Sequence, residues 1–237
     1  MQDAWYCSSL CFTAAAEQEI LRLLTSGTVL VNHISRMPLG LILINRGLLT
    51  IDQLRKATNE QKEAGDEIGE LLVRQGLLTE KQVTATRAAQ WGCPVFAVPA
   101  HAVRVAVNVP QALLRIYSMI PVHYVAATNL LLVGFVHRVE YGLLYAIEQM
   151  TGCQTRPCFV TPSDFRVQMH QREQLQEPRL KEKIFETIQT PAEMARILCS
   201  SSLEIEADEA SFGKCEEYLW ARLKSDSEAV DLLFKTY

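Results

Sequence analysis

Seven cysteines and five histidines are the residues of this chain that could bind a metal ion or act as nucleophiles. Cys7 and Cys11 are four residues apart, so a helix would place both thiols on one face. A zinc site needs further ligands, and His33, the nearest histidine, has no partner close to it in the sequence. Cys153 and Cys158 flank a strand-like segment and are typical of core or edge thiols. We therefore expect no metal site.

The other four histidines do not predict a catalytic pair. His101, His123, His137 and His170 show no mutual spacing typical of a general base and the residue that orients it, although a Cys–His pair would meet only in the fold. The sequence also contains no Gly-x-x-x-x-Gly-Lys-Ser/Thr loop, which P-loop NTPases use to hold nucleotide phosphates. We expect no catalytic residues and a protein that is not an enzyme.

Composition narrows the function classes further. The chain has 237 residues, of which 49% are hydrophobic, and a formal net charge of −4. These values are typical of a globular protein with a sizeable core, and the acidic balance argues against binding to a nucleic acid polymer. No apolar run is long enough to span a bilayer and no basic leader is present, so we expect no membrane insertion. The odd number of cysteines favours the reducing cytoplasm.

The clearest organisational feature is an internal repeat with an offset of 29 residues. Residues 39–61 align without gaps to residues 68–90, and eight of the 23 aligned positions are identical. The shared positions include two glycines, a Leu-Leu-Thr triplet and two glutamines. So many matches in one register indicate that both copies form the same structural unit.

Each copy is typical of a helix–turn–helix hairpin. A short apolar helix is followed by Gly47 or Gly76, where a left-handed C-cap is favourable for glycine. Thr50 or Thr79 then begins a second helix as its N-cap, and in the second copy the residues that follow form a partial capping box. A hairpin of this size cannot bury its apolar face alone, so we expect the two hairpins to pack against each other.

The flanking sequence predicts an α+β protein with further elements on both sides of the repeat. A helix is expected at 14–24 and a strand at 28–32. After the repeat we expect strands at 94–98 and 103–107, a helix at 110–117, a hairpin of strands at 122–127 and 130–136, a helix at 140–150, a strand at 155–160 and a helix at 161–171. The last helix is expected at 190–200, followed by strands at 209–215, 218–224 and 229–235.

These elements group into four parts. Residues 1–36 are an N-terminal extension, whose role the sequence leaves open. Residues 37–171 form the main domain, with the repeat at 37–92 and, at 93–171, an α/β half with a three- or four-stranded sheet. The polar stretch 172–189 is predicted to be a linker or an exposed helix. Residues 190–237 form a helix-and-meander appendage that is too small to fold alone and should dock or dimerise.

The repeat resembles the N-terminal regulatory domain of the ATPases that drive type II secretion and type IV pilus assembly, called the MshEN domain. Its motif has a Leu-Gly step, apolar pairs, Gly-Leu-Leu-Thr, Gln-Leu and a terminal Gln, and the resemblance extends over about 37–171. The appendage is more weakly similar to the segment that follows in those ATPases. The resemblance thus implies the regulatory part of such an ATPase without its motor.

Members of this family dock a protein subunit of the secretion apparatus or bind cyclic di-GMP. For cyclic di-GMP, the resemblance implies that glycine backbone approaches the ligand, that apolar side chains pack on guanine and ribose, and that glutamines form hydrogen bonds. The implied ligand-binding residues are Arg36, Leu39, Gly40, Leu43, Leu54, Gln61, Ile68, Gly69, Leu72, Val83 and Gln90.

Two departures from the motif bear on these alternatives. The arginine that opens the family motif is replaced by Pro38 in the first copy and by Glu67 in the second. Proline cannot pair with phosphate, and a carboxylate repels it; Arg36, two residues earlier, is the available substitute. We therefore predict an adaptor that docks a protein partner, with a cyclic di-GMP receptor as the alternative and no other cofactor.

Overall fold

The computed structural model describes residues 8–25, 36–99, 107–174 and 180–236. The helices are α1 Ser9–Thr25, α2 Leu39–Asn45, α3 Ile51–Ala64, α4 Ile68–Arg74, α5 Glu80–Trp91, α6 Gln111–Ile116, α7 Tyr141–Thr151, α8 Pro162–Gln174 and α9 Pro191–Glu204, with a 3-10 turn η1 at Ala126–Thr128. The strands are β1 Met119–Val125, β2 Leu130–Phe135, β3 Gln154–Phe159, β4 Leu180–Phe185, β5 Glu209–Cys215, β6 Tyr218–Lys224 and β7 Ala229–Lys235. The strand predicted at 28–32 and most of the one predicted at 103–107 lie outside the described residues.

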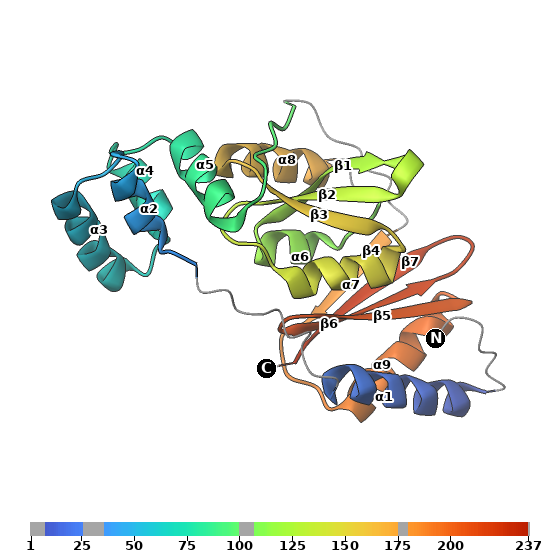
Figure 1. Cartoon of the computed structure of the whole chain (residues 1–237). Coiled ribbons are helices and arrows are strands. Elements are labelled where there is room, and N and C mark those ends of the chain that lie inside the picture. Colours follow the sequence, from blue (N-terminus) through green and yellow to red (C-terminus); the bar gives the residue numbers. More distant parts are fainter. Residues whose placement is uncertain (1–7, 26–35, 100–106, 175–179, 237) are drawn as a thin grey trace.

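Most of the chain is arranged in stacked layers, with the repeat projecting at one side (Figure 1). Helices α1 and α9 cover one face of the four-stranded sheet. Helix α7 lies between this sheet and the three-stranded sheet, because it contacts both β5 and β3. Helices α5 and α8 cover the other face of the three-stranded sheet, through contacts with β3 and β1. The α+β fold class is therefore confirmed. Among the described residues, no helix is both long and apolar enough to cross a membrane.

The repeat forms the two expected hairpins, α2–α3 and α4–α5. Gly47 and Gly76 follow the first helices with φ of +68° and +70°, as the left-handed C-cap requires. Thr50 and Thr79 begin the second helices, and both form complete capping boxes, with Gln53 and with Gln82. The two hairpins share one apolar core, separate from that of the α/β half.

The α/β half contains a three-stranded sheet in the order β1-β2-β3. Strands β1 and β2 form the expected antiparallel hairpin, and β3 pairs parallel to β2. The full strand predicted at 94–98 is wrong: only Val95 pairs, in a single bridge to Phe159. Pro94 has no backbone N–H to donate and Pro99 follows closely, so an extended ladder cannot form there.

The C-terminal unit is larger than the sequence predicts. Its sheet has the order β4-β7-β6-β5, and the predicted meander accounts only for β5, β6 and β7. The prediction of a linker or an exposed helix at 172–189 is wrong over Leu180–Phe185, because these residues form β4, which pairs parallel to β7. Phe185 of β4 stacks on Phe234 with ring centroids 4.8 Å apart, so burial of these aromatic rings stabilises the pairing.

The N-terminal helix belongs to this same unit. Ala16 and Ile20 of α1 are fully buried and share a core with α9 and with one face of the sheet. The other face of the sheet contributes Tyr218, Trp220 and Leu233 to the core of the α/β half. The appendage therefore docks on the main domain, and part of the N-terminal extension completes it.

Candidate functional site: the paired hairpins

The two hairpins pack with an internal two-fold relationship. The side-chain amide of Gln61 in the first hairpin donates to the Asp66 carbonyl, which precedes the second hairpin, at 3.0 Å. The amide of Gln90 in the second hairpin donates to the Met37 carbonyl, which precedes the first, at 2.7 Å. Met37 and Asp66 are equivalent in the repeat, so each motif glutamine closes the start of the other hairpin. Reciprocal contacts of this kind are typical of two-fold interfaces.

The glycines of the Leu-Gly steps are covered by side chains of their own hairpins. A Cβ atom at Gly40 would lie 2.5 Å from Cδ1 of Leu54. At Gly69 it would lie 2.7 Å from Cγ1 of Val83 and 2.9 Å from Nη2 of Arg87. Each glycine is thus explained by close packing of the two helices of a hairpin. The backbone that the resemblance assigns to a ligand faces protein side chains here.

The apolar residues proposed to contact a ligand lie within or against the core between the hairpins. Leu43 and Leu72, equivalent in the repeat, have no exposed surface. The remaining four are buried in this core or packed against it: Leu39, Leu54, Ile68 and Val83. The guanidinium of Arg36 stacks 3.7 Å above the Trp91 ring. The assignment of these residues to a ligand stays a prediction.

A cluster of charged side chains around the buried Arg87 joins the second hairpin to the α/β half, and the sequence analysis missed it. Arg87 of α5 is only 3% exposed and donates to the Val136 carbonyl at 2.9 Å. Its guanidinium also lies 3.2 Å from Nδ1 of His137 and 3.3 Å from Oε2 of Glu67. Glu70 lies 3.6 Å from the same imidazole. One feature of the sequence could have indicated this cluster: Glu67 places a carboxylate where the family motif has an arginine.

This cluster makes stability depend on pH. Burial first and the Arg87 charge second lower the pKa of His137, so the unfolded chain takes up this proton at higher pH than the folded chain does. The free energy of unfolding should therefore fall as the pH drops below about 6.5, the ordinary histidine value. His137→Asn should flatten this decrease when urea unfolding is followed between about pH 5 and 7. An equal slope in both proteins would contradict the prediction.

A pocket of about 250 Å³ lies beside Gly69, between the second hairpin and α8. Three arginines line it, yet each is already paired with a carboxylate. Arg74 pairs with Asp66, Arg87 with Glu67, and Arg166 with Glu80. A phosphate entering this pocket would have to compete with these carboxylates, so the pocket is poorly suited to a dinucleotide.

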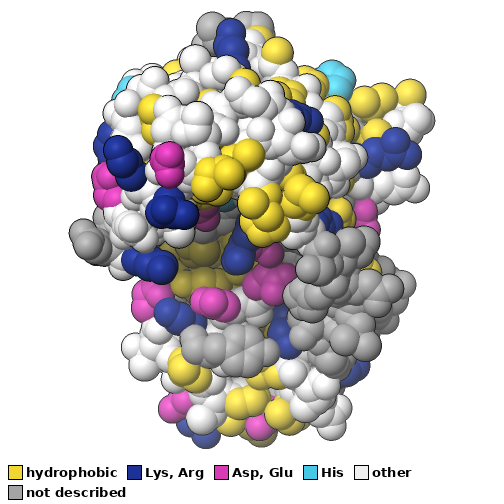
Figure 2. Space-filling view, turned by 60° about the vertical axis from the view of Figure 1, so that its left-hand side comes forward, with side chains coloured by type: hydrophobic (Ala, Val, Ile, Leu, Met, Phe, Trp, Pro, Cys, Tyr) yellow, Lys and Arg dark blue, Asp and Glu magenta, His cyan; other side chains and the backbone are white. Residues whose placement is uncertain are grey.

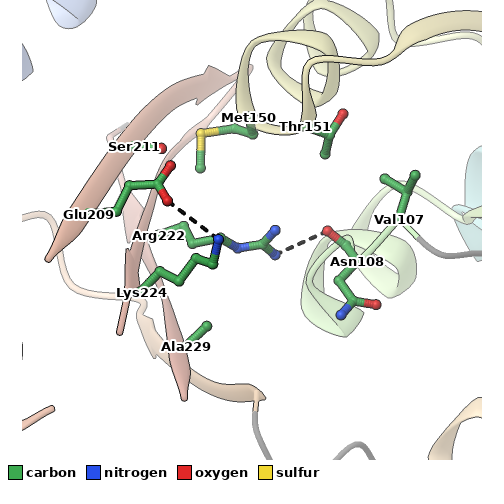
Figure 3. A pocket seen from close by; sticks show the side chains of 9 residues that line it. All are labelled: Val107, Asn108, Met150, Thr151, Glu209, Ser211, Arg222, Lys224 and Ala229. Carbon is green, nitrogen blue, oxygen red and sulfur yellow. Dashed lines mark hydrogen bonds and ion pairs between the residues drawn. The ribbon is translucent and has the colours of Figure 1, made fainter. Parts of the chain in front are cut away.

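A larger pocket, of about 400 Å³, lies between the C-terminal sheet and the α/β half (Figure 3). Arg222 reaches across it to the Asn108 carbonyl at 3.0 Å, and Lys224 lies 3.5 Å from Glu209. Arg222 also pairs with the buried Asp231 at 2.7 Å. The cations that line this pocket are paired with carboxylates of the protein. We therefore interpret the pocket as a polar contact region between the C-terminal sheet and the α/β half.

The cysteines and histidines are the remaining candidates for chemistry among the described residues. No group of three histidine, cysteine or acidic side chains that could hold a metal ion occurs within them. Cys7 and His33 lie outside the described residues. Burial raises the pKa of Cys158 to about 12, as expected for a thiol that stays protonated. The structure thus defines a paired-hairpin domain with an attached α/β half.

Comparison with known proteins gives partial matches. No protein-family model matches the chain. The type IV pilus assembly ATPase PilB of Thermus thermophilus is 29% identical over 131 residues, which are 54% of this chain and 14% of PilB. PilB of Myxococcus xanthus is 38% identical over 58 residues, which are 24% of this chain and 10% of PilB. The chain therefore spans only a small part of these relatives.

Solved structures also match about half of the chain. A structure of MshE with cdg has 20% identity and a TM-score of 0.46, over 57% of this chain and 98% of that one. The N-terminal domain of XpsE has 19% identity and a TM-score of 0.44, over 56% of this chain and 92% of that one. The resemblance to the ATPases of pilus assembly is confirmed by the two PilB relatives, over part of their length.

Proposed function

We propose that this chain is a non-enzymatic adaptor whose paired hairpins dock a protein subunit of a secretion or pilus apparatus. The main support is that the arginines around the second hairpin are already paired. Each arginine that lines the pocket beside Gly69 is paired with a carboxylate, and Gly69 itself is covered by Val83 and Arg87. A pocket whose arginines are already paired with carboxylates is less suited to an anionic dinucleotide, so the hairpins are better suited to a protein partner.

Binding of cyclic di-GMP is the second candidate, favoured by one specific feature. Both hairpins keep the glycine and the glutamine of the motif, and Gln61 and Gln90 stand at two-fold related positions. A two-fold symmetric dinucleotide would match this relationship, and MshE, one structural neighbour, was solved with cdg. The ligand would have to displace the glutamine contacts that close the hairpins.

Calorimetric titration separates the two candidates. For the adaptor, we expect no heat and no thermal shift with cyclic di-GMP up to about 1 mM. The matched variant Pro38→Arg restores the motif arginine of the first copy, and any binding gained there would show that the assay detects the ligand. Micromolar binding by the unmodified chain, lost in Gly69→Leu, would establish the receptor function.

The docking function has its own test. The cytoplasmic domains of pilus and secretion subunits are purified singly and titrated with the full chain by the same method. Saturable binding of one subunit with unit stoichiometry is the expected result. Failure of every subunit to bind would contradict the adaptor function.

A further inference from the structure

We propose that His137 is a pH-dependent switch that exchanges partners at the junction between the second hairpin and the α/β half. When its imidazole is neutral, it accepts a hydrogen bond from Arg87 of α5. When the imidazole is protonated, it pairs with Glu70 of α4, and Arg87 turns away from it toward Glu67. Such a switch would act on the hairpin itself, whether or not a partner docks there.

The contacts of His137 define which of its ring nitrogens carries the proton. Nδ1 of His137 lies 3.2 Å from Nη1 of Arg87. A guanidinium can only donate, so Nδ1 accepts and the proton of the neutral ring is on Nε2. Nε2 lies 3.6 Å from Oε1 of Glu70. The imidazole therefore joins an arginine of α5 on one side to a carboxylate of α4 on the other.

Protonation of Nδ1 is incompatible with the present position of Arg87. It would place an N–H and a second positive charge against Nη1, in a site where Arg87 is only 3% exposed. The same Nη1 donates to the Val136 carbonyl at 2.9 Å. Movement of Nη1 therefore weakens both hydrogen bonds from Arg87 to the α/β half, while Nη2 keeps Glu67, 3.3 Å away, as its partner.

The charged groups that face His137 come from both helices of the hairpin and from its own loop. Among the described residues they are Arg87, Glu67, Glu70 and Arg138. Burial and the arginine charges disfavour the imidazolium, whereas the carboxylates favour it. Burial is the largest of these effects, so the pKa of His137 is lowered and the switch should operate below about pH 6.5.

The pocket beside Gly69 gives Arg87 room to move. Arg87 lines this pocket, which has a volume of about 250 Å³. Nη2 of Arg87 lies 2.9 Å from the point that a Cβ atom at Gly69 would occupy. A side chain at Gly69 would therefore obstruct the guanidinium, and the glycine leaves its path open.

The first copy of the repeat lacks the switch and supplies an internal control. Glu67, Glu70 and Arg87 correspond to Pro38, Leu41 and Thr58. None of these three side chains titrates or carries a charge. The first hairpin should therefore not respond when the second one does.

NMR titration of the full ¹⁵N-labelled chain between about pH 5 and 8 tests the proposal. At the upper end, His137 should show the tautomer with its proton on Nε2. As the pH falls, His137 should titrate, and the side-chain Nε–H resonance of Arg87 and the amide of Gly69 should move with the same midpoint. The amide of Gly40 should not follow. A histidine that titrates without any response of Arg87, or one that stays neutral to pH 5, would overturn the proposal.

Three variants identify the partners. His137→Asn keeps an acceptor for Arg87 but cannot titrate, so the Arg87 resonance should stay at its high-pH position throughout. Glu70→Gln removes the charge that favours the imidazolium, so the midpoint should fall by about 0.5 pH unit or more. His170→Asn changes an exposed histidine of α8 and should leave the titration unchanged. An Arg87 response that persists in His137→Asn, or an unchanged midpoint in Glu70→Gln, would overturn the exchange of partners.

A salt control separates the switch from surface charges that also titrate in acid. Figure 2, which brings the hairpin side forward, shows acidic and basic side chains beside one another on this side of the molecule. Exposed pairs of this kind are screened at about 0.5 M salt, whereas the buried contact of Arg87 is screened much less. The Arg87 response should therefore persist in salt. Its loss would assign the response to surface charges and overturn the proposal.

Discussion

Replacement of Asp231 by alanine is expected to lower the free energy of unfolding by about 3–5 kcal/mol, because it breaks a buried ion pair and leaves the partner unpaired. Asp231 has no exposed surface and accepts hydrogen bonds from the Trp220 indole and from Arg222, at 2.8 Å and 2.7 Å. Without the carboxylate, the fully buried indole N–H loses its acceptor and the mostly buried guanidinium loses its ion-pair partner. Urea unfolding followed by tryptophan fluorescence measures the change.

The exposed ion pair of the same sheet supplies the control for this variant. Glu209 pairs with Lys224 at 3.5 Å, and both side chains are more than half exposed. Glu209→Ala should therefore change stability by less than about 1 kcal/mol. A cost for Asp231→Ala no larger than that of Glu209→Ala would show that the buried pair does not hold the sheet together.

Truncation of the hairpin core is the second prediction with a large effect. Leu43→Ala and Leu72→Ala should each destabilise the protein by about 2–5 kcal/mol, because both side chains are fully buried and their removal leaves a cavity. The two positions are related by the repeat, so the internal two-fold relationship predicts similar costs. Urea unfolding followed by circular dichroism measures both.

The matched control is an exposed leucine in the same helix as Leu43. Leu41→Ala should change stability by less than about 0.5 kcal/mol, since its side chain is half exposed. If Leu43→Ala and Leu72→Ala proved as mild as Leu41→Ala, these leucines would not form the shared core. They would then be available to a ligand, as the family resemblance implies.

The position of the buried charges explains why the sequence analysis missed the cluster around Arg87. Arg87 and Val136 are 49 residues apart, and neither stands in a motif. A lone arginine on a helix is usually solvent-exposed, so its burial depends on what packs over it. The same holds for Glu182, whose carboxylate accepts hydrogen bonds from the backbone of Gln111 and Ala112 at the start of α6. Burial raises the pKa of this carboxyl group.

Strand β4 was missed for a related reason. Its sequence, Leu-Lys-Glu-Lys-Ile-Phe, is half charged and follows a polar stretch, so composition favours a linker. It becomes a strand because β7 offers an unpaired edge and Phe234 offers a ring for Phe185. Edge strands often carry charged residues, which limit further pairing.

The sequence by itself determined the elements whose signals are local. Gly47, Thr50 and their repeat partners set the ends of the hairpin helices through backbone conformations and hydrogen bonds that span only a few residues. The tertiary structure alone decided which surfaces are covered: the glycine steps are covered by side chains of their own hairpins, and α8 borders the pocket beside Gly69. These contacts join residues that are far apart in the sequence and meet only after folding. A local sequence pattern therefore cannot predict them.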